Sequence, residues 1–483
     1  MDLESPKKLS PMNKIKTILF INFIFLVLSL SCVQNQEFSK TTQTLGEGPK
    51  ISSHIDQEDI NNIEISDLIK HGEMLFSTSF NELDGLGRPE SSGVGSKRAR
   101  REVPQNFNRI SGPDSNACIA CHVMPRLGGG GDNANNVFGL ASDVDFVTLE
   151  GSVGSENDSS SVFDITNERN TVGIFGDGLV ELLAREMSAD LLNQVKNLRK
   201  QSKDSNSSIS LELITKGVNF GTVIANPSGY LDTSNLDGID NDFIIRPFIQ
   251  KGVIASLRDF SNTSMNFHHG MQSEELVGKN SDADRDGIIN ELTEGDITAV
   301  TIFQATLDFP QRETPKEKSL IDAVIKGEEI FDSIGCSSCH APVMPLKSLK
   351  FVEPGPFNTD NSLNLFESDN NLVVDLEKFV SKLEKDDDGN YLVPLYSNLK
   401  RYDLGPKLNN ERPLQKGVPT NYWLTRKLWG FYSEPPFLHH GRANLLTDVI
   451  EMHQGDAKIS SDLYFEMSDS NKSFLIEFLK TFK

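Results

Sequence analysis

Two short segments of the chain share a pattern of apolar and polar positions that predicts a helix. The sequences LIKHGEMLFSTSF (residues 68–80) and VIKGEEIFDSIG (residues 324–335) both carry Gly-Glu, then a variable residue, an aliphatic residue and Phe. Strand-like alternation is scarce elsewhere, and stretches rich in Gly, Ser and Pro are common. The pattern therefore predicts a mainly α-helical chain with long loops and an internal repeat.

The most apolar segment lies near the N-terminus, in MNKIKTILFINFIFLVLSLSC (residues 12–32). Its apolar run follows Lys14 and Lys16, is too short for a comfortable membrane span and is typical of a secretory signal. The residues before Cys32 resemble a loose lipobox. We therefore expect a signal peptide over residues 1–31, an acylated Cys32 and a flexible tether over residues 32–62. The alternative is a plain signal peptide that ends in small residues.

Composition and charge limit the partners of the exported chain. The 483 residues include 69 acidic and 47 basic side chains, which gives a net charge of −22. This excess of negative charge argues against nucleic acid and anionic membrane surfaces as partners. We expect a protein on the periplasmic side of a bacterial membrane, inner or outer, held there only by its lipid anchor. The length is enough for two or three domains.

All cysteines after Cys32 lie in two copies of one motif, Cys-x-x-Cys-His. The two copies consist of Cys118, Cys121 and His122, and of Cys336, Cys339 and His340. In this motif the thiols add to the vinyl groups of haem and the histidine ligates its iron, so the sequence predicts two covalently bound haem c groups. One alternative is a single zinc site with four thiolates, which leaves both histidines unexplained. The other is a thioredoxin-like redox pair, for which a surrounding βαβ pattern is missing.

Each haem iron has a second axial position, and the chain has nine histidines to supply its ligand. The sequences NFHHG and EMHQG align His268 with His453, and each histidine precedes by two positions a glycine that permits close backbone approach. We expect His268 to ligate the first iron and His453 the second. His269 and Met271 compete with His268 for the first iron.

Other polar residues near these segments have different expected roles. His439 and His440, in PPFLHHGRA, are expected to shape a haem pocket, with Arg442 as a partner for a propionate carboxylate. His54 and His71 lie in polar sequence before the first motif and are expected to be solvated.

Several longer blocks resemble one protein family. SGPDSNACIACHVMPRLGGGG, RNTVGIFGDGLVELLAREM, DADRDGIINELTEGDITAVTIFQATLDFP and LWGFYSEPPFLHHGRANLLTDVIEMHQG are similar to sequences of the di-haem oxidoreductase family, often called thiol oxidoreductase-like, within the di-haem cytochrome c peroxidase group. The resemblance, over about residues 65–480, implies two facing cytochrome c-like domains with haems close enough for electron transfer. We assign them to residues 63–312 and 313–483. The resemblance also implies that His453 is a distal ligand.

The chain departs from a working peroxidase of this group at its first haem. Such enzymes carry a distal histidine soon after the first motif, whereas no histidine lies between His122 and His268 here. An acid–base residue would have to come from Gln272, Glu274 or Glu275. The alternative for the two glutamates is that they are ordinary solvated helix residues.

Two further features remain open. Relatives often have histidine at the position of Tyr402, which we expect to make a hydrogen bond in the haem pocket rather than to ligate iron. Asp282, Asp284 and Asp286 resemble the first half of a calcium loop, but Thr293 stands at the twelfth position, where an EF-hand has glutamate. The wider group holds a calcium ion between its domains, so this segment is either a Ca²⁺ site or an acidic inter-domain turn.

Two functions of different classes fit these features. In the first, the chain is a peroxidase-like di-haem oxidoreductase. Its C-terminal bis-histidine haem passes electrons to or from an N-terminal haem that handles peroxide or another redox substrate. In the second, it is a non-catalytic periplasmic electron-transfer protein with two saturated haems. Both need a periplasmic electron donor or acceptor as partner, and the fold alone does not decide between them.

Overall fold

The computed structural model describes residues 47–87, 115–131, 134–137, 167–284, 286–359, 362–363, 371–411 and 414–483. Residues Ile51–Lys483 form one compact unit. The predicted signal peptide and the acylation site Cys32 lie outside the described residues. Within the described ranges, no helix is both long and apolar enough to cross a membrane.

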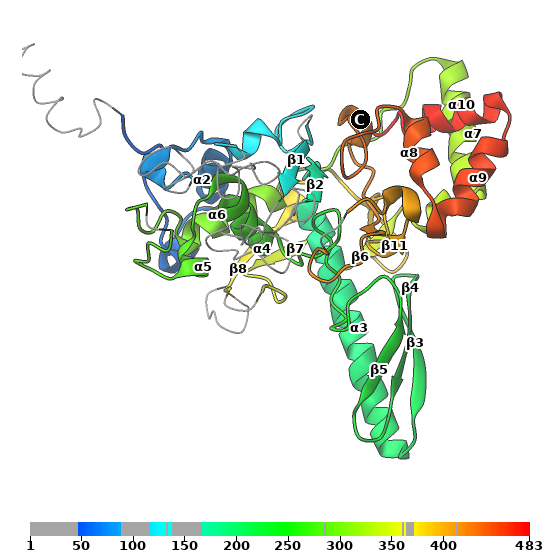
Figure 1. Ribbon diagram of the computed structural model, residues 1–483, viewed down its shortest axis with the longest axis horizontal. Helices are drawn as coiled ribbons and strands as arrows, with labels where there is room; N and C mark the ends of the chain where they lie inside the picture. Colours follow the sequence, from blue (N-terminus) through cyan, green and yellow to red (C-terminus); the bar gives the residue numbers. More distant parts are fainter. Residues whose placement is uncertain are drawn as a thin grey trace, which may run out of the picture. The chain divides into compact units, whose positions relative to one another are not determined.

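The helices of these ranges are named in Figure 1. They are α2 (Ile65–Ser77), α3 (Asp177–Ser205), α4 (Leu257–Ser264), α5 (Glu274–Val277), α6 (Glu294–Ala305), α7 (Lys318–Ser333), α8 (Leu446–Met452), α9 (Lys458–Glu466) and α10 (Asp469–Leu479). A π-helical turn, η5 (Met265–His269), continues α4, and short 3₁₀ turns include η1 (Gln57–Asn62), η3 (Cys118–Ala120) and η6 (Cys336–Ser338).

Small antiparallel sheets lie between the helices. Their strands are β1 (Ala134–Val137), β2 (Asn167–Asn170), β3 (Ile209–Thr215), β4 (Val218–Ala225), β5 (Leu231–Leu236), β6 (Met344–Leu346), β7 (Lys350–Glu353), β8 (Leu372–Asp375), β9 (Glu384–Lys385), β10 (Tyr391–Val393), β11 (Arg401–Asp403) and β12 (Tyr422–Leu424). They pair as β1-β2, β3-β4-β5, β6-β10-β9, β7-β8 and β11-β12. Helix accounts for 39% of the structure and strand for 16%, so the prediction of a mainly α-helical fold is only partly right.

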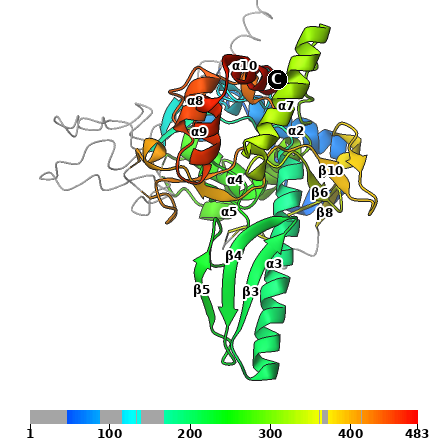
Figure 2. The same cartoon turned by 90° about the vertical axis from the view of Figure 1, so that its right-hand side faces the viewer.

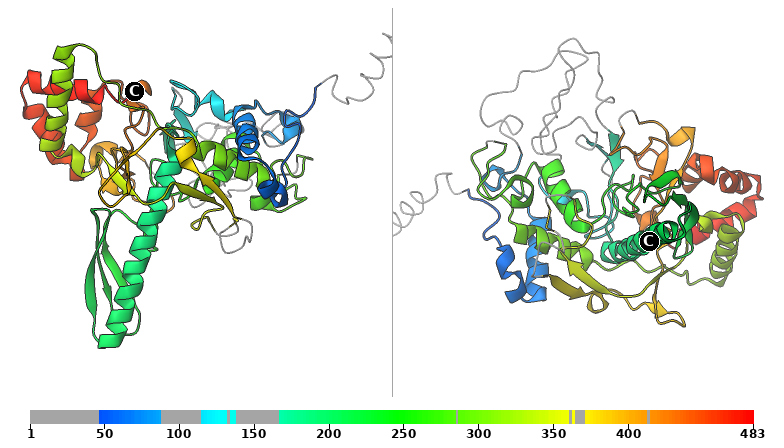
Figure 3. Two further views of the ribbon diagram at one scale, coloured as in Figure 1. Left: turned by 180° about the vertical axis from the view of Figure 1, so that it is seen from behind. Right: turned by 90° about the horizontal axis from the view of Figure 1, so that it is seen from below.

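The strands that the sequence pattern did not predict include the sheet β3-β4-β5, which packs against α3 (Figure 3). Leu191, Val195 and Leu198 of α3 join Phe220 and Val223 of β4 in one buried apolar cluster. The opposite face of the sheet carries mostly polar side chains. A sheet with a single covered face shows apolar side chains only at alternate positions. Register shifts in β3-β4 and β4-β5 interrupt that alternation and weaken the sequence signal.

The two predicted helices each cross a second helix at a glycine. α2 crosses α6 at Gly72, where a Cβ atom would overlap with the backbone of Ala299. α7 crosses α10 at Gly327, where a Cβ atom would overlap with the backbone of Phe474. Figure 2 shows α7 beside α10. The glycine shared by both copies of the repeat therefore lets two helices approach closely.

The phenylalanine of each repeat joins its helix crossing to a Cys-x-x-Cys-His motif. Phe76 of α2 lies 5.3 Å from Phe303 of α6 and 6.0 Å from His122, measured between ring centres. Phe331 of α7 lies 5.2 Å from Phe478 of α10 and 6.4 Å from His340. The repeat in the sequence thus corresponds to a repeated arrangement of two helices and one motif.

The segment predicted as the end of a flexible tether is part of the compact unit. In η1, Ile60 is 1% exposed and belongs to the largest buried cluster. The backbone N–H of Ile51 donates to Asp84 Oδ1 over 2.9 Å. The Oγ1 atom of Thr298 on α6 donates to Gln57 Oε1 over 2.7 Å. The predicted tether over residues 32–62 is therefore wrong for residues 51–62, because their apolar side chains are buried.

His71 is largely buried, which corrects the sequence prediction for this residue, whereas the side chain of His54 is 37% exposed. Both bind the buried carboxylate of Asp296, with His54 Nδ1 at 2.6 Å and His71 Nε2 at 2.7 Å. Burial raises the pKa of Asp296, but hydrogen bonds from the two histidines outweigh burial and lower it to about 2. The hydrogen bond to Asp296 raises the pKa of His54 above 6.5, against the opposing effect of burial. This cluster ties α2 and the segment before η1 to the N-terminal end of α6.

Candidate functional site

The two cysteines and the histidine of the C-terminal Cys-x-x-Cys-His motif all line one cavity of about 320 Å³. Helix α7 ends just before it, and Gly335, with φ of 87°, turns the chain into η6. Cys336, Cys339 and His340 all line this cavity, and both cysteines are free thiols. An apolar cluster that includes residues of α7, α8, α9 and α10 borders it, with Tyr464 of α9 and Phe478 of α10 almost fully buried. We call this space the C-terminal cavity.

His453 lies opposite His340 in the C-terminal cavity. Their ring centres are 6.5 Å apart and their planes differ by 49°. Metal–imidazole bonds of about 2 Å put two ligand nitrogens roughly 4 Å apart across one metal ion. Each ring centre lies a further ring radius behind its nitrogen, so the observed spacing fits one iron atom between the rings. The residues present therefore fit a bis-histidine haem.

Backbone carbonyl groups fix the orientation of both rings. His340 Nδ1 donates to Tyr396 O over 3.0 Å, and His453 Nδ1 donates to Val449 O over 2.7 Å. Donation by Nδ1 leaves Nε2 of each neutral ring as the atom with a lone pair for a metal. Burial, followed by the neighbouring His453, lowers the pKa of His340 to about 4, and burial also lowers the pKa of His453. Both imidazoles are thus kept in the neutral form that ligates iron.

The glycine two positions after each aligned histidine permits close backbone approach, as the sequence predicts. A Cβ atom on Gly455 would overlap with the backbone of Asp403, and one on Gly270 would lie against the backbone of Gly87. The alignment of His268 with His453 therefore has a common structural basis, because both segments need a glycine for close approach.

Of the other residues predicted for the C-terminal haem pocket, some line the cavity and others do not. Tyr402 and His439 line the cavity, whereas His440 does not. The Tyr402 hydroxyl accepts a hydrogen bond from Asn398 Nδ2 over 2.8 Å and lies beside Cys339. Arg442 is also absent from the lining. Its half-exposed side chain pairs with Glu168, so the structure does not support its predicted role at a propionate.

Two cations that the sequence patterns did not single out line the C-terminal cavity in place of Arg442. These are Arg426, paired with Glu434 over 3.0 Å, and Lys427, paired with Asp177. Neither residue belongs to a short motif, so only long-range contacts reveal its place. They are better positioned than Arg442 for the carboxylates of a haem.

The N-terminal motif lines a second, smaller cavity of about 120 Å³, here called the N-terminal cavity. Cys118, Cys121 and His122 contribute to it, and Phe76 of α2 closes one side. Burial, followed by the neighbouring His268, lowers the pKa of His122 to about 4. Its buried Nδ1 has no hydrogen bond of ordinary geometry within the described residues, although the backbone of Gly129 and Val172 lies beside the ring.

The thiol pairs occupy two separate cavities. Cys118 and Cys121 line one, and Cys336 and Cys339 line the other. Among the described residues, no group of three or more cysteines and histidines brings its ligand atoms within 4.8 Å of one another. A single zinc site with four thiolates is therefore wrong.

His268 and His269 both line the N-terminal cavity but have different surroundings. They lie on η5, a π-helical turn, a geometry often found at functional sites. His269 is 2% exposed, and its Nδ1 donates to Ser115 O over 2.6 Å. Its Nε2 then accepts from the Cys118 thiol over 3.3 Å. Because His269 contacts the attachment cysteine, His268 is the better placed of the two to face His122.

Met271 and Gln272 lie away from the N-terminal cavity. Met271 is fully buried in an apolar cluster with Leu75, Phe80 and Leu292, so it does not compete for the first iron as predicted. Gln272 is 2% exposed, and it too is absent from the cavity lining. Its backbone N–H donates to Glu291 Oε2 over 2.7 Å.

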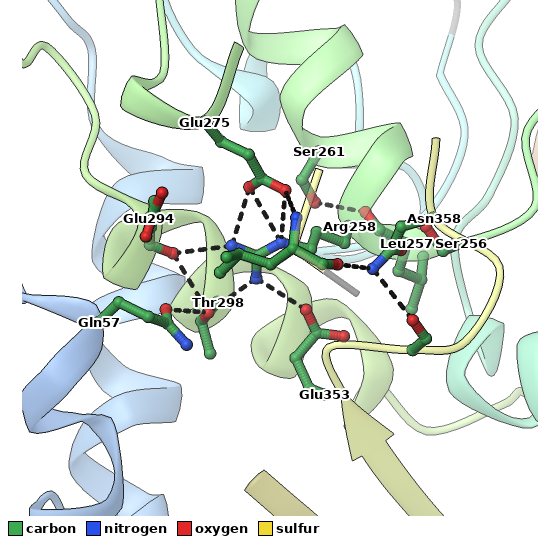
Figure 4. Close-up of polar contacts among 12 residues, drawn as sticks. Gln57, Ser256, Leu257, Arg258, Ser261, Glu275, Glu294, Thr298, Glu353 and Asn358 are labelled. Carbon is green, nitrogen blue, oxygen red and sulfur yellow. Dashed lines mark hydrogen bonds and ion pairs between the residues drawn. The ribbon is translucent and has the colours of Figure 1, made fainter. Parts of the chain in front are cut away.

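Glu275 forms a buried ion pair instead of facing the N-terminal cavity, as Figure 4 shows. Both of its oxygens lie 2.9 Å from Arg258 Nε. Arg258 Nη1 also donates to Glu353 Oε1 over 2.8 Å. Burial raises the pKa of Glu353 to about 7 even though Arg258 opposes the shift. Glu274 is also absent from the cavity lining.

These placements do not support Gln272, Glu274 or Glu275 as acid–base residues at the first haem. Glu275 is not an ordinary solvated helix residue either, because its carboxylate is buried against Arg258. The polar side chains that do line the N-terminal cavity include Arg169, Thr263 and Gln304. They come from β2, α4 and α6, which no local sequence pattern groups together.

One layer of residues separates the two cavities. Asn170, Val172, Ile249, Gln250 and Phe260 line both of them. Gln250 Nε2 donates to the backbone oxygen of Asn170 over 2.7 Å, which joins the two segments of this wall. The two Cys-x-x-Cys-His motifs are thus neighbours in space despite their separation in sequence.

The acidic segment keeps its carboxylates together. One oxygen from each of Asp282, Asp284 and Asp286 lies within 4.8 Å of the others. The backbone N–H groups of Asp286 and Gly287 donate to Asp282 over 3.1 and 3.2 Å. Exposed acidic groups commonly adopt such arrangements without an ion, so Ca²⁺ binding stays a prediction.

Comparison with known proteins finds a family similarity in the C-terminal part of the chain. The model of the family described as "Di-haem oxidoreductase, putative peroxidase" matches residues 385–482, which confirms the resemblance over this region. No curated protein matches the chain. A solved structure of hydrazine synthase from Kuenenia stuttgartiensis, pressurised with 20 bar xenon, is similar to 91% of this chain over 98% of its own length, with 12% identity and a TM-score of 0.36. The family match supports a haem oxidoreductase in general.

Proposed function

We propose that this chain, similar over residues 385–482 to di-haem oxidoreductases, is an exported di-haem c-type cytochrome that acts as an oxidoreductase. The C-terminal cavity would hold a haem with two histidine ligands. That haem would exchange electrons with a haem in the N-terminal cavity, which handles peroxide or another redox substrate. We assign the corresponding cytochrome c-like domains to residues 63–312 and 313–483.

The observation that carries this proposal is the pair His340 and His453. The two rings face each other with 6.5 Å between their centres, and Cys336 and Cys339 line the same cavity. Two thiols, a proximal imidazole and an opposed imidazole are the groups that a covalently bound bis-histidine haem requires. If the two cysteines and two histidines only packed the cavity, the two imidazole rings would not need a spacing that fits one iron atom.

The residues of the C-terminal cavity would hold and orient the haem. Tyr396 O and Val449 O accept hydrogen bonds from Nδ1 of the two imidazoles, which leaves each Nε2 free to ligate the iron. The aromatic side chains of Phe331 and Phe478 exclude water on the side of His340. When bound, haem supplies an iron that changes between the ferrous and ferric states.

The N-terminal cavity is proposed to hold the haem that reacts with substrate. His122 would be its proximal ligand and His268 its distal one. His268 lies on a π-helical turn, an irregular element that is often found at functional sites. We therefore propose that His268 is the more easily displaced of the two distal histidines. Two neutral imidazoles give the C-terminal haem a lower potential than a His/Met pair would.

Location and calcium binding extend this proposal. Asp282, Asp284 and Asp286 would bind Ca²⁺.

Acylation at Cys32 would tether the chain to the periplasmic side of a bacterial membrane. Cys32→Ala should release soluble protein or leave the precursor unprocessed, and unchanged membrane association of processed protein would contradict the anchor. A periplasmic electron donor or acceptor is the partner that the proposed function needs.

Mass spectrometry of mature protein made with a cytochrome c maturation system tests the proposal directly. Two added haem masses are expected. Cys118→Ser with Cys121→Ser should remove one haem and leave the other, and Cys336→Ser with Cys339→Ser should do the converse. Mature protein without covalent haem would overturn the proposed function.

A non-catalytic electron carrier is the second candidate, because the N-terminal cavity is also lined by a second histidine, His268, besides His122. His268 is close enough to His122 to contribute to the lowered pKa of His122. Absorption spectra of reduced protein with and without carbon monoxide separate the two functions. Carbon monoxide binding to one haem supports the oxidoreductase, and two unreactive low-spin haems support the carrier.

A further inference from the structure

We propose that Glu434 is a positioning residue for electron exchange between the two haems, because its carboxylate joins the backbone beside His122 to the arginine beside His340. This inference rests on the proposed di-haem function and assigns it a residue outside both attachment motifs. In the exchange, one electron moves from a ferrous to a ferric iron, and no bond or proton moves with it.

Glu434 is one of the few buried carboxylates at the boundary of the two cavities. It is 3% exposed and lines the C-terminal cavity just after the turn formed by Phe431–Ser433. Its Oε2 accepts a hydrogen bond from the backbone N–H of Gly173 over 3.2 Å. The same oxygen pairs with Arg426 Nη2 over 3.0 Å. One oxygen atom thus connects two segments that lie far apart in the sequence.

On the N-terminal side, Glu434 reaches the peptide group that lies against His122. The backbone of Val172 lies beside the His122 ring, and Val172 C=O and Gly173 N–H belong to the same peptide group. Peptide groups are planar and rigid, so fixing the N–H also fixes the carbonyl. The hydrogen bond from Gly173 to Glu434 therefore restrains the wall of the N-terminal cavity.

Two glycines make room for this carboxylate. A Cβ atom on Gly173 or on Gly130 would overlap with the Glu434 side chain. Gly130 belongs to the glycine-rich run that follows the first attachment motif. The backbone of the N-terminal haem region is therefore shaped around Glu434, as close approach without a side chain requires.

On the C-terminal side, Arg426 connects Glu434 to the other proximal histidine. The backbone of Arg426 lies beside the His340 ring, and its side chain ends at Glu434. A continuous sequence of contacts therefore runs from His122 through the Val172–Gly173 peptide and Glu434 to Arg426 and His340.

The chemistry of Glu434 favours a positioning role over simple packing. Placing a carboxylate in a buried site costs several kcal/mol before its ion pair recovers part of that cost. An apolar residue of the same volume would often stabilise such a site better. A directional hydrogen bond to one peptide group is what an apolar residue cannot supply. Electron exchange depends steeply on the separation of the two irons, so the restraint has a functional consequence.

The test uses the mature di-haem protein with Glu434→Gln and Glu434→Met, because the second variant preserves volume and removes the carboxylate. Pulse radiolysis adds one electron per molecule, and absorbance follows its redistribution between the two haems. Glu434→Met should slow this redistribution by roughly fivefold or more. Hydrogen exchange at the Gly173 amide should be faster in both variants, in protein with and without haem. Glu168→Gln, which breaks the outer pair with Arg442, is the matched control and should change neither quantity.

Haem content separates this inference from the proposed function. If the parent protein binds no covalent haem, the proposed function is wrong and the inference falls with it. If parent and variants bind two haems, and Glu434→Met redistributes the electron and protects Gly173 as the parent does, only the positioning role of Glu434 is wrong. Should Glu434 variants fail to fold, Arg426→Gln breaks the same contact from a more exposed side chain and is expected to slow redistribution as well.

Discussion

His340 and His453 face each other across one cavity with 6.5 Å between their ring centres, although more than a hundred residues separate them. His340 is the last residue of the second attachment motif, and His453 is the C-cap of the short helix α8. Each ring is oriented by a different backbone carbonyl, that of Tyr396 or Val449. The spacing and the two Nδ1 hydrogen bonds leave the Nε2 atom of each neutral ring available to a metal ion between the rings.

Replacing His453 should change the spin state of one haem. With His453→Ala, the C-terminal iron would lose its second ligand and become high-spin, while the N-terminal haem stays as it is. Electron paramagnetic resonance of the oxidised protein should show one of two low-spin signals replaced by a high-spin signal. The neighbouring Gln454→Ala, which alters an exposed side chain, is the control and should leave both signals intact.

His268→Ala provides the reciprocal comparison for the other cavity. It should open, or further open, the N-terminal iron to carbon monoxide and leave the signal of the C-terminal haem unchanged. If His453→Ala leaves both low-spin signals untouched, the alignment that assigns His268 and His453 to corresponding positions is wrong.

The glycine at the α7–α10 crossing should be intolerant of any side chain. In Gly327→Ala, the new methyl group would overlap with the backbone of Phe474, so the helices must separate. Overpacking of this kind costs about 1–3 kcal/mol. Denaturant unfolding should show this loss. Gly48→Ala, where no atom lies within 4 Å of the added Cβ, should be close to neutral, and equal stability of the two variants would contradict the crossing.

The contact between Asp296 and His54 should stabilise the fold over a pH window, with one limit set by each residue. The pKa of Asp296 is lowered to about 2, so its contribution is present above its unfolded value of 3.8 and is lost as pH falls through about 2. The pKa of His54 is raised above 6.5, so its contribution is full below pH 6.5 and is lost as pH rises through the folded pKa. The cluster therefore stabilises the fold most between these limits.

Asp296→Asn should reduce and flatten this profile. Loss of hydrogen bonds from two histidines to a buried charged group should cost roughly 2–4 kcal/mol near pH 5.5 and less outside the window. Urea unfolding at a series of pH values measures the profile. Asp67→Asn, which alters an exposed pair with Lys70, is the control and should leave it nearly unchanged. If the free energy of unfolding of Asp296→Asn varied with pH in parallel with that of the parent, the proposed role of this cluster would be wrong.

Glu275 should matter for stability and not for the chemistry of the first haem. Glu275→Gln leaves the fully buried Arg258 with Glu353 as its remaining ionic partner among the described residues, and breaking a buried pair in this way costs about 3 kcal/mol. Thermal unfolding should show the loss, while reaction of the N-terminal haem with peroxide continues. Glu274→Gln should affect neither. A stable Glu275→Gln protein that no longer reacts with peroxide would restore Glu275 as an acid–base residue.

Local patterns in the sequence were enough for the features that depend on adjacent residues. The two Cys-x-x-Cys-His motifs, the helices that precede them and the shared Gly and Phe of the repeat are all encoded within short windows. The alignment of His268 with His453 as ligands stays a prediction, and its local basis is the glycine two positions after each histidine, which lies against another backbone segment. Residues 51–62 show the limit, since their polar composition hid the buried Ile60.

Contacts between distant segments were decided only by the tertiary structure. Nothing around Asp296 indicates that His54 and His71 bind it, and nothing around Arg258 indicates that Glu275 and Glu353 enclose it. Arg442 was a reasonable partner for a haem by sequence proximity, yet Arg426 lines the cavity and Arg442 does not. The physical reason is that burial and ion pairing depend on which segments pack together, whereas covalent attachment and helix periodicity depend on neighbours along the chain.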